Sequence, residues 1–98
     1  MRLIVSAAAQ QDITEIAIYI EERGGSREVA RNFVSRLREK CGHLASVPFA
    51  TGVPRDDLRA GLRSYAFYNY MLFYEFLDDR MHLLKVTEGH RNMEELFQ

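Results

Sequence analysis

This 98-residue chain has no tryptophan, one cysteine and two prolines, and none of its apolar runs is long enough to span a membrane. Cys41 is alone, so the chain cannot form an internal disulfide, and no zinc-ligand cluster is visible. A bilayer span needs roughly 20 apolar residues, and the amino terminus lacks the basic and apolar segments of a signal peptide. We therefore expect a cytoplasmic protein with no membrane contact, metal or cofactor.

A strongly basic composition is also missing. The formal net charge is -1, which argues against the broad cationic surface of non-specific nucleic-acid binders, so direct nucleic-acid binding is not expected. Residues 1–63 carry ten Lys/Arg and eight Asp/Glu (+2), whereas residues 64–98 carry three and six (-3). This asymmetry suits an acidic partner for the basic half, although an ordinary solvated surface is the simpler explanation.

The length and composition indicate one globular domain covering residues 1–98. Hydrophobic residues make up 47% of the chain and charged residues 28%, which is the balance of a folded soluble domain. No internal repeat or low-complexity segment divides the chain.

Two antiparallel helices are predicted in the first half. Ser6 and Ser26 can accept hydrogen bonds from the free amides of a first helical turn, Gly24–Gly25 ends the first helix and Pro48 stops the second. Both helices carry apolar residues at three- and four-residue spacing, which predicts one buried stripe on each. The stripes are Ala9, Ile13, Ile16, Ala17 and Ile20, then Ala30, Phe33, Val34, Leu37, Cys41, Leu44 and Ala45.

Two residues of these helices need separate interpretation. Cys41 falls within the second stripe, so a small core residue explains it better than a nucleophile does. Ile18 lies about 180° from the first stripe at 100° per residue, and the stripe does not explain it.

The remaining segments predict strands. Residues 2–5 form a short apolar run, and residues 62–68, 70–77 and 82–87 are rich in aromatic and β-branched residues with breaks between them. Residues 49–60 hold both glycine and proline without periodicity, which indicates a connecting loop. The predicted fold is α+β with the order β-α-α-β-β-β, an antiparallel sheet covered on one face by a helical hairpin.

The middle strand, residues 70–77, is apolar on both faces. Tyr70, Leu72, Tyr74 and Phe76 alternate with Met71, Phe73 and Leu77, and only Glu75 interrupts the second row. Two helices cover one face of a small sheet, so an exposed apolar patch is expected on the other, as at many binding surfaces. The alternative is that residues 49–60 and the tail after Arg91 fold over that face.

Short motifs follow one another along the chain: Asp12-Ile13, Ile16, Tyr19-Ile20, Ala30, Phe33, Ala45, Pro48, residues 57–64, residues 69–74, Val86 and residues 89–92. Their order is similar to that of the ParE toxins of the RelE/ParE superfamily. The resemblance implies a RelE/ParE-like fold and a toxin of a type II toxin–antitoxin system, neutralised by a ParD-like antitoxin. It also implies DNA gyrase as the target, whereas RelE relatives cut messenger RNA on the ribosome.

The chain departs from the RelE pattern at the residues that cut RNA. By comparison with those enzymes, Met71 stands where the strand arginine is expected and Phe97 where the terminal tyrosine is expected, while Arg91 is retained. Arg63 is the only base near the expected lysine pair. Because RNA cleavage needs an acid and a base, a non-catalytic toxin is predicted. His90, beside Arg91, is the one candidate for an acid or base, and the alternative is that it is a solvated surface histidine.

Three functions remain open at this point. The first is a gyrase inhibitor that acts by binding, the second is a RelE-like ribosome-dependent endoribonuclease using Arg63, His90 and Arg91, and the third is a structural module or toxin relic without a target. For the first, the amphipathic tail of residues 89–98 is the candidate target contact, through Arg91, Met93, Leu96 and Phe97, unless its apolar residues pack on the sheet. The predicted antitoxin contacts are Ile18, Arg63, Tyr65, Phe67, Met71, Phe73, Leu83 and Lys85.

Overall fold

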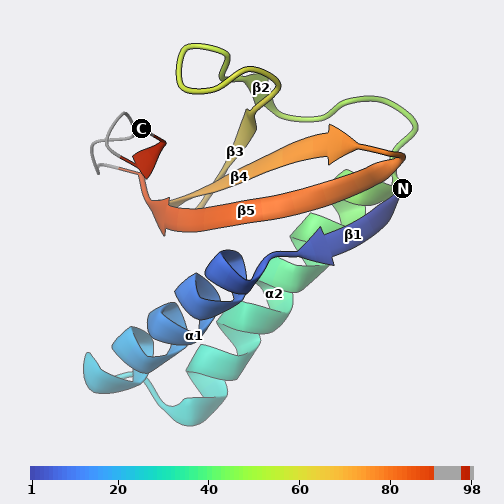
Figure 1. Ribbon diagram of the computed structural model, residues 1–98. Coiled ribbons are helices and arrows are strands. Elements are labelled where there is room, and N and C mark those ends of the chain that lie inside the picture. The colour runs from blue at the N-terminus through green and yellow to red at the C-terminus, as the bar shows by residue number, and fades with distance from the viewer. Residues whose placement is uncertain (90–95, 98) are drawn as a thin grey trace.

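A computed structural model of the chain describes residues 1–89 and 96–97. Two helices precede most of the sheet, whose strands lie in the order β1-β5-β4-β3-β2 (Figure 1). The elements are β1 (Arg2–Val5), α1 (Ala7–Glu22), α2 (Arg27–Ser46), β2 (Val53–Pro54), β3 (Arg63–Phe67), β4 (Tyr70–Leu77) and β5 (Arg80–Glu88).

The helix ends follow the local signals. The Ser6 hydroxyl accepts a hydrogen bond from the Ala9 amide at 3.0 Å, and the Ser26 hydroxyl accepts one from the Val29 amide at 3.1 Å. Each bond satisfies an amide that has no partner within its helix. The predicted helical hairpin and its caps are therefore confirmed. Within the described residues, neither helix is long and apolar enough to cross a membrane.

The sheet is mostly antiparallel, with one parallel edge. β5, β4, β3 and β2 pair antiparallel in succession, while β1 pairs with β5 in parallel. The β4–β5 turn places Asp78 and Asp79 at φ values of 53° and 58°, as a two-residue hairpin of this type requires. The predicted α+β fold is confirmed, with the addition of β2, a two-residue edge strand in the segment that was expected to be only a loop.

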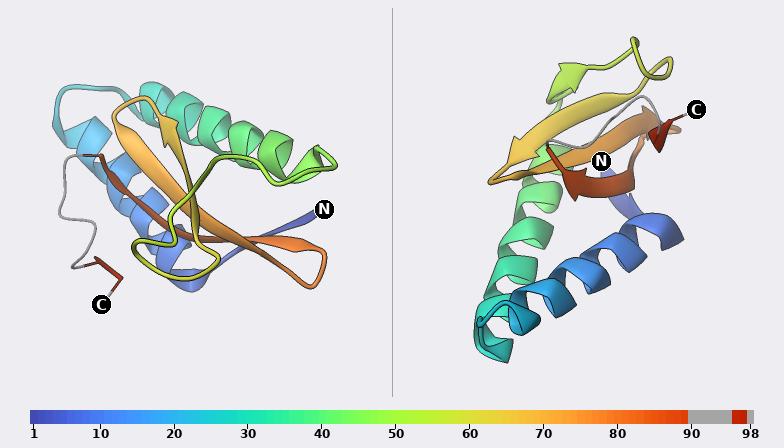
Figure 2. Two further views of the ribbon diagram at one scale, coloured as in Figure 1. Left: turned by 90° about the horizontal axis from the view of Figure 1, so that it is seen from above. Right: turned by 90° about the vertical axis from the view of Figure 1, so that its left-hand side faces the viewer.

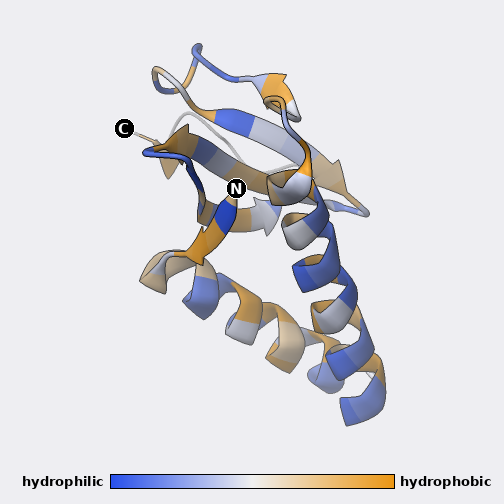
Figure 3. Cartoon of the chain, turned by 90° about the vertical axis from the view of Figure 1, so that its right-hand side faces the viewer, coloured by the Kyte–Doolittle hydropathy of each residue, from blue (hydrophilic) through white to orange (hydrophobic). Residues whose placement is uncertain are grey.

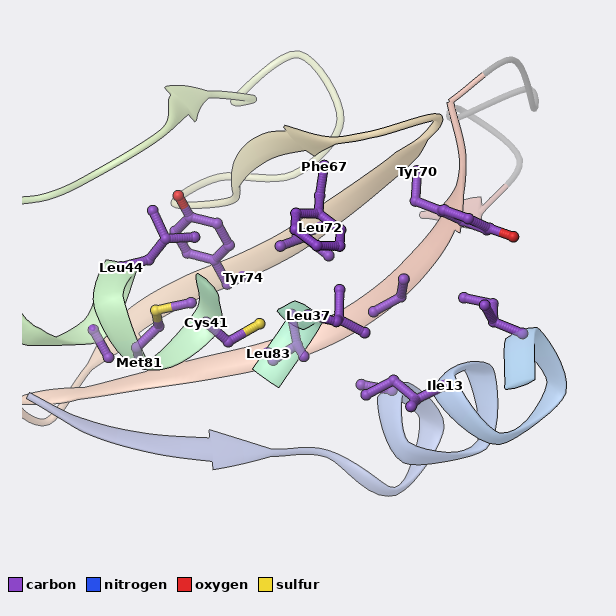
Figure 4. Packing of buried hydrophobic residues seen from close by; sticks show 14 residues of the cluster. Ile13, Leu37, Cys41, Leu44, Phe67, Tyr70, Leu72, Tyr74, Met81 and Leu83 are labelled. Carbon is purple, nitrogen blue, oxygen red and sulfur yellow. The ribbon is translucent and has the colours of Figure 1, made fainter. Parts of the chain in front are cut away.

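The main core lies between the helices and one face of the sheet (Figures 2 and 4). Cys41 belongs to it, with 2% of its surface exposed, and burial raises the pKa of its thiol to about 11. The interpretation of Cys41 as a core residue is therefore confirmed. The largest fully buried side chains of this cluster are Tyr74, Leu37, Leu72, Met81 and Leu83.

The opposite face of the sheet is covered as well, so the expectation of an exposed apolar patch there is wrong. Phe73 on β4 is fully buried, and its ring centroid lies 4.9 Å from that of Phe97. In the segment before β3, the Arg59 guanidinium pairs with the Glu75 carboxylate of β4 at 3.4 Å. These two contacts support the alternative expectation. Phe97 of the tail and Arg59 of the connecting segment both lie against this face.

Strand register also corrects the predicted antitoxin contacts. Tyr65 lies opposite Leu72, so it is on the helix-facing side of the sheet and not on the face that was predicted to bind the antitoxin. Phe67 and Leu83 are likewise buried in the main core, at 7% and 1% exposure. In β5, the register with β4 shifts at Leu84, which breaks the alternation that was assumed from Leu83 to Lys85.

Candidate partner-binding surface

An apolar hollow follows the seam between α1 and α2. It has a volume of about 450 Å³. Ala17 and Ile18 of α1 and Ala30 and Val34 of α2 form its apolar part, which we call the hairpin groove. Ile18 is 48% exposed, because it lies on the far side of α1 from the buried stripe, as its position in the helix predicts. Figure 3 shows that apolar and polar residues alternate along both helices of the hairpin.

The rim of the hairpin groove is basic. Arg27, Arg31 and Arg38 of α2 line it, against one carboxylate, Glu21 of α1. Arg27 lies 3.6 Å from Glu21, and Arg38 donates a hydrogen bond to Gln10 at 2.9 Å. Among the described residues Arg31 has no ion-pair partner, so the rim keeps an excess of positive charge next to an apolar floor. An apolar segment that carries carboxylates complements this surface.

Arg63 has a structural role at the start of β3. Its guanidinium donates hydrogen bonds to the backbone carbonyls of Thr51 at 2.6 Å and Gly52 at 3.1 Å, which hold the preceding segment against the sheet. The Thr51 hydroxyl in turn lies 3.2 Å from the Tyr74 hydroxyl, whose pKa is raised by burial. These hydrogen bonds orient the guanidinium toward the protein backbone and reduce its availability to a phosphate group.

Comparison with known proteins gives the family. The family model described as the ParE toxin of the type II toxin–antitoxin system, parDE, matches residues 3–93. This chain belongs to the ParE toxin family. No curated protein matches it. A chain of the structure described as the chromosomal ParDE TA system from P. aeruginosa superposes on this ParE-family chain with a TM-score of 0.79. The match has 19% identity and covers 90% of this chain and 95% of that one.

The described residues of the ParE-family chain test the nuclease hypothesis only in part. Met71 is half-buried on the opposite face of the sheet, and His90 and Arg91 lie outside the described residues. His43 is on α2, and His82 is on β5 opposite Glu75. Within residues 1–89 and 96–97, no group of histidine, cysteine and carboxylate side chains is arranged to hold a metal ion.

The predicted contacts of the ParE-family chain are therefore divided among different environments. Ile18 is accessible in the hairpin groove, and Lys85 reaches Asp12 on α1, with 3.5 Å between its Nζ and a carboxylate oxygen. Leu96 and Phe97 of the tail are half-buried, while Arg91 and Met93 lie outside the described residues.

Sequence reasoning gave no role to Asp12, which joins α1 to the sheet in this ParE-family fold. β1 stops pairing with β5 at Leu83, and beyond it the Val86 amide donates to the Asp12 carboxylate at 2.9 Å. The same carboxylate pairs with Lys85. Asp12 therefore replaces a missing strand partner at the edge of β5. The sequence signal for this role was the position of Asp12, an acidic residue beside the apolar stripe of its helix.

Proposed function

We propose that this ParE-family chain is a cytoplasmic toxin that binds DNA gyrase without catalysing a reaction, and that a ParD-like antitoxin neutralises it. The observation that carries the proposal is the hairpin groove, an exposed apolar surface with a basic rim and no partner within the described chain. Such a surface is typical of a protein that functions in a complex.

The environment of Arg63 supports a toxin that acts by binding. A nuclease needs positive charge directed at the phosphate and a separate acid and base. The Arg63 guanidinium is directed at two backbone carbonyls. Met71 stands on the next strand, where the RelE enzymes are expected to have an arginine. Loss of one such group typically lowers a rate by about 10²–10⁴-fold, so the combined changes are incompatible with efficient cleavage.

The hairpin groove is the proposed antitoxin site. Its apolar floor is suited to an amphipathic segment, and its excess arginine charge favours carboxylates on that segment. Ile18 is the central predicted contact because it is the large apolar side chain most exposed there. The buried side chains Phe67, Phe73 and Leu83 support the sheet on which the hairpin rests.

The tail is a proposed contact with the target. Phe97 packs on Phe73, which attaches the end of the chain to the sheet. We propose that Arg91, Met93 and Leu96 contribute to the target contact. Deleting residues 91–98 tests this proposal. Loss of growth arrest with unchanged antitoxin binding supports this role, and unchanged growth arrest contradicts it.

The target is tested by inducing the toxin alone and following DNA and protein synthesis with labelled precursors. Gyrase inhibition predicts that DNA synthesis stops first, together with a DNA-damage response, and that the purified chain inhibits supercoiling by purified gyrase. Immediate loss of translation with cleaved transcripts would instead identify a ribosome-dependent nuclease. Normal growth after induction would contradict both activities.

The antitoxin site is tested with Ile18→Asp and Arg31→Glu. Each change places a carboxylate in the hairpin groove, and we expect antitoxin affinity to fall on the order of ten- to a hundred-fold, as for an interface hot spot. Arg36→Glu is the matched control, because Arg36 is an exposed arginine of α2 outside the groove. Isothermal titration calorimetry with the purified antitoxin gives the affinities. Equal losses for Arg31→Glu and Arg36→Glu would show a general charge effect and no specific site.

A further inference from the structure

Tyr68 combines backbone strain with exposure. It is the first residue of the two-residue turn between β3 and β4, and its φ is +54°. Asn69, the second turn residue, is not in the left-handed region. A hairpin turn with positive φ at its first position strongly favours glycine, because a bulky side chain is disfavoured there. The side chain is nevertheless a tyrosine, and 68% of its surface is exposed.

The packing around Tyr68 explains how this conformation is held. Its ring centroid lies 4.8 Å from that of Phe67 and 5.9 Å from that of Phe33 on α2. Phe67 and Phe33 also contact each other at 5.6 Å, so they form a firm base on which the tyrosine rests. The strained backbone thus fixes the direction of a ring whose outer surface remains in solvent. Strain of this kind concentrates at functional positions.

The neighbourhood of Tyr68 lies on the flank of α2 opposite the hairpin groove. Relative to the buried Leu37, a step of 100° per residue places Arg27, Arg31 and Arg38 at about 80–120° on one side. The same step places Phe33, Lys40, Val29 and Arg36 at about 40–100° on the other side. Lys40 confirms this placement, because its Nζ lies 5.4 Å from the ring centroid of Tyr65 on β3.

A compact surface therefore surrounds Tyr68. Val29 is 52% exposed and lies one helical turn before Phe33, which extends the apolar area beside the tyrosine. Arg36 and Lys40 continue the same flank of the helix with positive charge. We call Val29, Phe33, Arg36, Lys40 and Tyr68 the Tyr68 surface.

We propose that the Tyr68 surface is the main contact with the protein target of the toxin, with Tyr68 as its anchor. The proposal rests on the proposed function, that the toxin acts by binding. The partner surface that fits offers an apolar pocket to the tyrosine ring and carboxylates to Arg36 and Lys40. A rigid aromatic side chain loses little entropy on binding, which suits an anchor.

A protein partner fits this surface better than a nucleic acid does. Nucleic-acid affinity comes mainly from many phosphate contacts, whereas the Tyr68 surface offers two cations in a chain with a formal charge of -1. Its apolar residues Val29 and Phe33 lack the polar groups that contact phosphates and sugars. The surface therefore has the apolar centre and charged rim of a protein interface.

The test compares Tyr68→Gly with wild type and with Phe49→Gly. Glycine accepts the positive φ at position 68, so the turn should be retained while the ring is removed. Phe49 is the matched control, because it is 64% exposed and lies outside the Tyr68 surface. Tyr68→Asn is a second variant that tolerates this backbone conformation. Growth arrest is followed at matched toxin levels, together with antitoxin affinity and thermal melting of the purified chains.

We expect Tyr68→Gly and Tyr68→Asn to melt no lower than Phe49→Gly and to keep antitoxin affinity. Removal of an interface anchor should raise the toxin level needed for growth arrest on the order of thirty-fold. The proposal is overturned if both variants arrest growth like wild type, if both lose antitoxin binding, or if both fail to fold. Binding of a labelled single-stranded oligonucleotide that depends on Tyr68 would also overturn it, in favour of a nucleic-acid contact.

Failure of the proposed target is distinguishable from failure of this inference. A wild-type toxin that arrests growth without inhibiting purified gyrase contradicts gyrase as the target, while the variants still report whether Tyr68 contacts the true target. A wild-type toxin that does not arrest growth overturns both proposals.

Discussion

Replacement of Asp12 by alanine tests how α1 is attached to the sheet. The change removes the carboxylate that accepts the Val86 amide at 2.9 Å and pairs with Lys85 at 3.5 Å. Val86 is only 3% exposed, and β1 no longer pairs with this part of β5. The amide therefore loses the acceptor that replaces a strand partner at this edge.

The expected loss of stability follows from these two contacts. A buried donor left without an acceptor costs about 1–3 kcal/mol, and a partly exposed ion pair contributes less than about 1 kcal/mol. A hollow of about 220 Å³ adjoins Asp12, so water can partly replace the carboxylate and reduce the first figure. We expect Asp12→Ala to lower the free energy of unfolding by about 2 kcal/mol, which corresponds to a melting temperature roughly 10 °C lower.

Urea denaturation followed by circular dichroism measures this loss, with two controls. Lys85→Ala removes only the ion pair and should change the unfolding free energy by less than about 1 kcal/mol. Asp12→Asn keeps an acceptor oxygen, so its loss of unfolding free energy should lie between those of Lys85→Ala and Asp12→Ala. A loss below about 0.5 kcal/mol for Asp12→Ala, within the range of ordinary surface substitutions, would refute the role assigned to Asp12.

Two further predictions concern Gly52 and Cys41. In Gly52→Ala the new Cβ would overlap the Tyr74 hydroxyl at a φ of +76°, so we expect a loss of about 3 kcal/mol or more in urea denaturation. Gly61→Ala has a similar φ of +81° but open space around the Cβ, so a loss as large as that of Gly52→Ala would contradict overlap as the cause. For Cys41, the folded state keeps the thiol protonated up to a pKa of about 11, against a usual 9.0. The unfolded chain therefore releases this proton first as pH rises, and stability should fall between pH 9 and 11 by on the order of 2–3 kcal/mol. Unfolding measured at pH 8 and 10.5 should show a smaller fall in Cys41→Ala, and an equal fall would assign the effect to the buried tyrosines.

The parts of the fold that depend on local signals were predictable from the sequence. The caps at Ser6 and Ser26 and the apolar stripes of both helices each arise within a few residues, so their pattern survives in the linear sequence. The two-residue strand β2 has no such signal, because Val53 and Pro54 become a strand only by pairing with Ser64 and Arg63. Its proline is tolerated at the edge of the sheet.

The faces of the sheet were only partly predictable. Alternation along β4 correctly separated its two rows of side chains, but the register of its neighbours is a tertiary property. Because of the irregularity at Leu84, Leu83 and Lys85 lie on opposite faces of the sheet, and no residue type at this position predicts the irregularity. The cover over Phe73 comes from Phe97 at the far end of the chain, which no periodicity connects to β4.

The two proposed surfaces on α2 make neutralisation and toxicity separable. A helix bound in the hairpin groove would add a body about 10 Å across on the Arg31 flank, while Tyr68 lies on the opposite flank of α2. Such a helix alone would leave the tyrosine ring exposed, so neutralisation requires antitoxin segments that continue beyond the groove or bulk that blocks the target. Arg31→Glu should therefore remain toxic but resist neutralisation, whereas Tyr68→Gly should bind antitoxin but arrest growth only at a higher toxin level. If either substitution weakened both antitoxin binding and growth arrest, antitoxin and target would share one surface. The division of α2 into two functional flanks would then be wrong.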